Sequence, residues 1–138
     1  MPDEFLDSNV LIYAFTIDRR AEIAQSLLAR GCAVSVQALN EFANVARRKL
    51  GMTWEEVREA LAAIRALCSL VRPVDIETHT RALHVAERYG CTIFDALMIA
   101  AALQANGAVL WTEDMQHGMV INGKLRVANP FRELAHRS

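Results

Sequence analysis

Residues 93–103 read IFDALMIAAAL, and residues 109–112, which follow past Gly107, read VLWT. Ten of the eleven residues in the first segment are apolar, so the segment predicts a helix that is buried nearly all round. The second segment has the β-branched and aromatic residues of a buried strand. A buried helix that leads into a buried strand is typical of α/β proteins with a parallel sheet.

The same alternation extends through the rest of the chain. Three further apolar runs predict short strands, and the last of them contains Pro73, which is tolerated at the edge of a sheet. The pair Asn122-Gly123 predicts a hairpin turn. We therefore predict a three-layer α/β/α sandwich with a central parallel sheet. The expected strands are residues 4–7, 32–36 and 70–74, and the expected helices are residues 9–15, 21–30, 37–50, 77–89 and one opened by a capping box at Thr53 and Glu56.

Length and composition exclude several classes of protein. We expect residues 1–138 to form a single domain, because 138 residues is an ordinary domain length. The chain is 53% hydrophobic and 22% charged, which excludes a disordered protein. Its longest apolar run, residues 96–103, is far too short to cross a bilayer. The N-terminus is acidic and the three cysteines are widely spaced, so we expect a cytoplasmic protein.

Four acidic residues stand at informative places in this pattern. Asp95 lies in the apolar helix, three positions after a capping Thr92, where burial of a carboxylate is costly without compensation. Asp7 closes the first strand, Glu41 lies in the second turn of the helix after the second strand, and Asp114 follows the strand at 109–112. Each has an ordinary explanation by itself, such as helix capping, a turn or a solvated helix face.

Topology brings these four positions together. In a parallel sheet with right-handed crossovers, a helix that leaves a strand starts at the carboxyl edge, and a helix that enters a strand runs antiparallel to it. All four acids are therefore expected at the carboxyl edge of the sheet. Such a cluster would repel itself unless divalent cations occupied it, and carboxylate ligands favour Mg²⁺ or Mn²⁺. Two hard cations held by carboxylates suit phosphodiester hydrolysis.

Four short segments together resemble the PIN domain, and most of all its VapC-type toxin branch. They are DSNVLIY at residues 7–13, LNEF at 39–42, FDALMIAAA at 94–102 and TEDM at 112–115. The resemblance covers essentially the whole chain, and the four-part pattern is specific although each part is weak.

The resemblance implies a metal-dependent endoribonuclease that hydrolyses phosphodiester bonds in RNA. It also implies a homodimer that is neutralised by a small antitoxin, whose tail enters the active-site groove. The family's ligands for Mg²⁺ or Mn²⁺ match four acids here, and two polar residues match its supporting positions. The ligands are Asp7, Glu41, Asp95 and Asp114, and the supporting residues are Asn9 and Thr112.

Other interpretations stay open from the residues alone. The acidic edge could belong to a non-catalytic module that binds RNA or a protein partner. A phosphoryl-receiving signalling domain also uses clustered acids with Mg²⁺, but Lys124 falls in the hairpin and not on a late strand, which disfavours it. The basic run at residues 47–49 either contacts phosphates or forms a solvated helix end. We expect Trp54 to pack in the protein. The apolar stripe of Val57, Leu61, Ile64 and Leu67 either packs in the core or a dimer interface or forms a surface for a partner helix.

Overall fold

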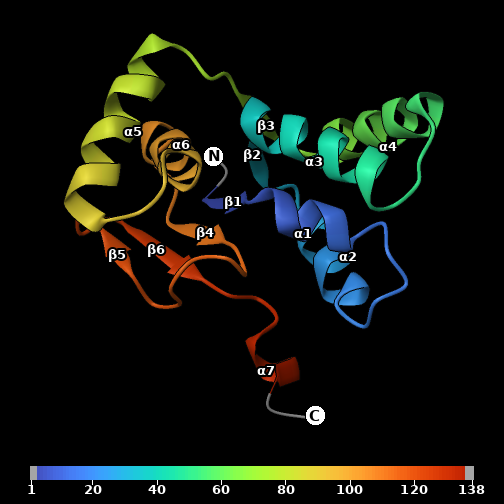
Figure 1. Ribbon diagram of the computed structural model, residues 1–138. Helices are drawn as coiled ribbons and strands as arrows, with labels where there is room; N and C mark the ends of the chain where they lie inside the picture. Colours follow the sequence, from blue (N-terminus) through green and yellow to red (C-terminus); the bar gives the residue numbers. More distant parts are fainter. Residues whose placement is uncertain (1–2, 136–138) are drawn as a thin grey trace.

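A six-stranded sheet forms the centre of the computed structural model, which describes residues 3–135 (Figure 1). The strand order is β3-β2-β1-β4-β6-β5, and all neighbouring strands are parallel except β5, which is antiparallel to β6. The predicted edge strand is therefore confirmed, because β3 lies at one end of the sheet. The strands are β1 (Glu4–Leu6), β2 (Ala33–Ser35), β3 (Leu70–Arg72), β4 (Val109–Trp111), β5 (Val120–Ile121) and β6 (Leu125–Ala128).

Helices lie on both sides of this sheet. Figure 1 shows α5 and α6 on one side and α1 to α4 on the other. The predicted α/β class, with a mostly parallel central sheet between helices, is confirmed. The helices are α1 (Ser8–Tyr13), α2 (Ala21–Ala29), α3 (Val36–Arg48), α4 (Trp54–Leu67), α5 (Ile76–Tyr89), α6 (Ile93–Gln104) and α7 (Arg132–Ala135). None of the helices in this described part is long and apolar enough to pass through a membrane.

Local signals in the sequence set several element boundaries. Thr53 and Glu56 form the predicted capping box at the start of α4. Gly90 ends α5 in the left-handed conformation, with φ of 68°. Asn122 and Gly123 turn the hairpin between β5 and β6 with φ values of 53° and 66°, as a tight turn with both central residues at positive φ requires.

The apolar helix α6 packs against the sheet through small side chains. Ala96 and residues 98–102 are buried. Gly107 then lets the chain pass close to β1, because a Cβ atom there would lie 3.1 Å from the ring of Phe5 and 3.2 Å from the carbonyl oxygen of Ala102. The expectation that the helix is buried nearly all round is wrong at Phe94, which is 60% exposed.

The expected packing of Trp54 on α4 is also wrong, because this side chain is 58% exposed. In the apolar stripe of the same helix Val57 and Ile64 are buried, whereas Leu67 is 47% exposed and its packing in a dimer stays a prediction. The reason for both exposures is the position of α4, which packs mainly against α3 and α2 and so has one covered side. The guanidinium of Arg47 lies over the Trp54 ring, with Cζ at 4.8 Å from the ring centroid.

Candidate active site

The carboxyl ends of β1 and β4 form the centre of the candidate site. The chain leaves β1 toward β2 on one side, whereas β4 pairs with β1 on the other side. Open α/β sheets bind ligands at such a switch point. Asp7 directly follows β1 and Thr112 directly follows β4, and the backbone amide of Asp7 donates to the carbonyl oxygen of Trp111 at 3.0 Å. The topology therefore places these two side chains next to each other.

Asp7 is a buried carboxylate with two strong donors. Its side chain caps α1, with Oδ1 accepting from the Ser8 amide at 2.6 Å and Oδ2 accepting from Thr112 Oγ1 at 2.8 Å. The residue is only 3% exposed. Its pKa is raised from 3.8 to about 6: burial is the main cause, the hydrogen bonds from Thr112 and Ser8 oppose it, and the charges of Glu41 and Asp114 add to the increase.

Glu41 is joined to Asp7 through a hydroxyl group. It lies in the second turn of α3, which starts directly after β2. Its Oε1 accepts from Ser8 Oγ at 2.8 Å and its Oε2 accepts from Gln37 Nε2 at 3.0 Å, and Ser8 Oγ also lies 3.4 Å from Asp7 Oδ1. Both carboxylate oxygens of Glu41 are thus fixed by hydrogen bonds, and the bond from Ser8 keeps Oε1 close to Asp7.

Asn9 and Thr112 orient the loop that carries Asp114. Asn9 Nδ2 donates to Thr112 Oγ1 at 3.0 Å and to Asp114 Oδ2 at 3.1 Å. The Asp114 amide donates to Thr112 Oγ1 at 3.1 Å. The Thr112 hydroxyl therefore donates to Asp7 and accepts two bonds, which uses its full hydrogen-bonding capacity.

Asp95 is linked to the other acids by its charge. It lies in the first turn of α6, where its amide donates to the capping Thr92 Oγ1 at 3.2 Å. Burial raises the pKa of Asp95, and the negative charges of Asp114 and Glu41 raise it further. Asp95 has no side-chain hydrogen bond to another acid within residues 3–135. Of the four acids, Asp95 is therefore the one whose side chain is least constrained by hydrogen bonds.

Sequence reasoning missed three residues that hold this arrangement in place. Ser8 bridges two acids and Gln37 orients Glu41. Glu113 accepts from Tyr13 Oη at 2.8 Å and from Arg20 Nε at 2.9 Å, which fastens the loop after β4. The sequence contains signals for two of them: Ser8 is in the polar pair that directly follows Asp7, and Glu113 directly precedes Asp114.

The donor set fits a hard divalent cation. Carboxylate, hydroxyl and amide oxygens are the ligands that Mg²⁺ and Mn²⁺ prefer, and a nearby divalent charge would offset the repulsion that raises the pKa of Asp7. With the side chains as they stand, no three acidic, histidine or cysteine residues within the described range converge on one point that could hold a metal ion. Binding would therefore require rotation of side chains, and Asp95 is the least constrained of them by hydrogen bonds.

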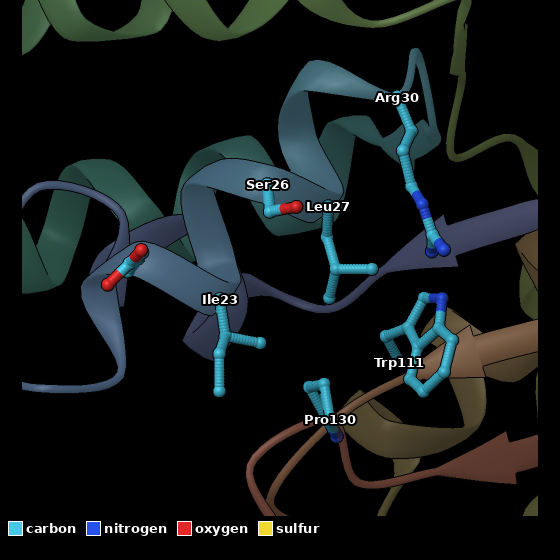
Figure 2. A pocket seen from close by; sticks show the side chains of 7 residues that line it. Ile23, Ser26, Leu27, Arg30, Trp111 and Pro130 are labelled. Carbon is cyan, nitrogen blue, oxygen red and sulfur yellow. The ribbon is translucent and has the colours of Figure 1, made fainter.

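A cavity of about 420 Å³ adjoins Glu41 and Asp114 and is called the polar cavity because most of its lining residues are polar or charged. A second cavity of about 460 Å³, called the apolar cavity, lies elsewhere. Figure 2 shows the apolar cavity, where Ile23 and Leu27 of α2 lie opposite Trp111 and Pro130. None of the four acids lines that cavity. Glu41 and Asp114 line the polar one, whereas Asp7 and Asp95 do not, so the polar cavity gives access to two of the four acids.

Comparison with known proteins agrees with this fold. The chain matches the family model of the PIN domain over residues 5–118, and it belongs to the PIN domain family. The sequence has no significant match among curated proteins.

Solved structures of toxins share the fold. A toxin–antitoxin complex from Klebsiella pneumoniae matches with a TM-score of 0.69 and 19% identity, covering 92% of this chain and 97% of that chain. VapC20 of Mycobacterium tuberculosis, a toxin that cleaves the sarcin–ricin loop, matches with a TM-score of 0.66 and 21% identity over 80% and 91% of the two chains. VapBC2 from Rickettsia felis, bound to promoter DNA, matches with a TM-score of 0.65 and 19% identity over 91% and 97%.

Proposed function

We propose that this protein is a metal-dependent endoribonuclease that hydrolyses phosphodiester bonds in RNA. The observation that carries the proposal is the buried carboxylate of Asp7, whose pKa is raised to about 6 by burial and by the neighbouring charges of Glu41 and Asp114. Perturbed acids gathered at a switch point are typical of an active site. Membership of the PIN domain family supports the same reaction, because PIN domains are generally nucleases.

Each residue has a distinct role in the proposal. Bound Mg²⁺ or Mn²⁺ would lower the pKa of an attacking water and stabilise the departing oxygen. Thr112 and Asn9 orient the carboxylates through the hydrogen bonds described above, and Ser8 keeps Glu41 beside Asp7. The proposed ligands are Asp7, Glu41, Asp95 and Asp114.

We further propose that the protein is the toxin of a toxin–antitoxin pair and acts in the cytoplasm as a homodimer. Two of the compared structures are toxin–antitoxin assemblies and a third is an RNA-cleaving toxin, which supports a small antitoxin as the partner. Co-expression with the product of a small neighbouring gene tests this assignment. We expect the partner to restore growth to cells that produce the protein and to bind it in a stable complex. Growth inhibition that no neighbouring product relieves would contradict the antitoxin partner, and absence of growth inhibition would contradict the toxin role.

The enzymatic proposal is tested with purified protein and labelled single-stranded RNA. We expect cleavage in Mg²⁺ or Mn²⁺, complete loss of cleavage in EDTA, and recovery when the metal is restored in excess. Cleavage that is indifferent to chelation would contradict the metal-dependent mechanism. Tight RNA binding without cleavage in any metal would instead support a non-catalytic binding module.

A further inference from the structure

The polar cavity beside the acids continues along α3 as a groove. Its walls come from α1, α3 and the loop after β4, so it joins three segments that are distant in the sequence. One end contains the acids Glu41 and Asp114, and Lys49 lines the groove beyond the last residue of α3. The other residues of the groove are Ser8, Asn9, Ile12, Tyr13, Asn44, Val45 and Glu113.

The helical spacing shows how far the groove extends. Glu41, Val45 and Lys49 are four residues apart, so they lie along one face of the helix. Eight residues at 1.5 Å each place Lys49 about 12 Å from Glu41 along the helix axis. This distance puts Lys49 within reach of nucleotides that flank a phosphate held at the acids, and too far away to act on that phosphate itself.

Positive charge gathers at the Lys49 end. Arg47 is engaged elsewhere, because its Nη1 donates to the carbonyl oxygen of Met52 at 2.8 Å and its guanidinium lies over Trp54. Arg48 and Lys49 are exposed, and neither forms an ion pair with any residue between 3 and 135. An unpaired ammonium group at the end of a polar groove is suited to a phosphate.

We propose that this groove holds the RNA strand next to the cleaved bond and that Lys49 binds one of its backbone phosphates. The inference rests on the proposed ribonuclease function and adds the path of the substrate. The lining suits a nucleic-acid strand, because every residue other than Ile12 and Val45 carries an amide, a hydroxyl or a charge, with apolar surface exposed between these groups. Lys49 is thus a substrate-binding residue that does not touch the reacting atoms.

The test replaces Lys49 with Ala and uses Lys124→Ala as the matched control. Lys124 is exposed in the turn before β6. Because β6 is parallel to β4, this turn lies at the edge of the sheet opposite to the acids. Both variants remove one lysine charge, so a general electrostatic effect would appear equally in both. Melting temperatures establish that both variants fold.

RNA affinity is measured by fluorescence anisotropy of a labelled single-stranded oligonucleotide, with Asp95→Asn present in all proteins to prevent cleavage. For Lys49→Ala, we expect a roughly threefold to tenfold higher Kd at low salt. We also expect the dependence of log affinity on log salt to become shallower by about 0.7, the loss of one phosphate contact on a single strand. With Asp95 restored, KM for RNA should rise while kcat is unchanged. Lys124→Ala should change none of these quantities.

Equal Kd values and equal salt dependence for the two lysine variants would overturn the inference. If Lys49→Ala weakened binding of an antitoxin while RNA affinity stayed the same, the groove would be a protein-binding surface and the inference would also fail. In both cases, metal-dependent cleavage by the unchanged protein would still support the ribonuclease proposal. Absence of RNA cleavage and of RNA binding by the unchanged protein would instead refute that proposal and this inference with it.

Discussion

Thr112 Oγ1 lies 2.8 Å from Asp7 Oδ2 and donates a hydrogen bond to it, although the two residues are 105 positions apart in the chain. The same hydroxyl accepts from Asn9 Nδ2 and from the Asp114 amide. One side chain therefore joins the end of β1 to the loop after β4. The position of Asp114 relative to Asp7 depends on this residue.

Thr112→Val should destabilise the protein by about 1 to 3 kcal/mol, because a carboxylate oxygen loses its donor and two N–H groups lose their acceptor. The variant should also raise the pKa of Asp7 above its present value of about 6, since the lost hydrogen bond lowers that pKa. Denaturant unfolding measures the first effect. Thr112→Ser keeps the hydroxyl and is the control. Equal stability of the Val and Ser variants would contradict the role assigned to this hydroxyl.

Asp7→Asn should stabilise the metal-free protein at neutral pH. The pKa of Asp7 is about 6 in the folded state, above the ordinary 3.8, so its ionised form is disfavoured by folding. This penalty is fully present above pH 6 and disappears as pH falls toward 3.8. The shift corresponds to up to about 3 kcal/mol at pH 7.5.

The measurement compares the free energy of unfolding of Asp7→Asn with that of the unchanged protein, both in EDTA. The difference gives the contribution of the Asp7 carboxylate to stability. We expect a large difference at pH 7.5 that falls close to zero near pH 4. A difference that does not vary with pH would show that burial of the Asp7 charge is not the cause.

Added Mg²⁺ or Mn²⁺ should raise the melting temperature, because an ion that binds only the folded state stabilises it. At a concentration of 100 times Kd the gain would be about 2.7 kcal/mol. It should be larger at pH 8 than at pH 5.5, since carboxylate ligands bind in their ionised form. Glu41→Gln should reduce the gain, whereas Glu87→Gln, on the exposed surface of α5, should not. Equal gains in these two variants would argue against Glu41 as a ligand.

Parts of the fold could be predicted because their signals are local. The capping box at Thr53 and the Asn122-Gly123 turn depend on the conformations of a few adjacent residues. The placement of Asp7 and Thr112 at the carboxyl edge of the sheet follows from the direction of the strands in a parallel sheet. The pairing of β1 with β4, which makes the two residues neighbours, is known only from the structure.

Other features depend on contacts between distant residues and had no comparable signal. Glu113 binds Tyr13 and Arg20, which lie about 100 and 93 positions away, so its role is defined only after β4 pairs with β1. The apolar ring of Trp54 predicts a packed residue, whereas Trp54 is exposed because α4 is covered on one side by α3 and α2. Apolar periodicity indicates which face of a helix is apolar, but it does not show how much of that face a neighbour covers.

The most direct test of the account is RNA cleavage in Mg²⁺ by Asp95→Asn. This residue is the one that the structure joins to the other acids by charge and not by hydrogen bonds, so its replacement should leave the fold and the melting temperature essentially intact. We predict a loss of cleavage on the order of 100-fold or more. A folded variant that cleaves RNA at the rate of the unchanged protein would show that the four acids do not form the active site.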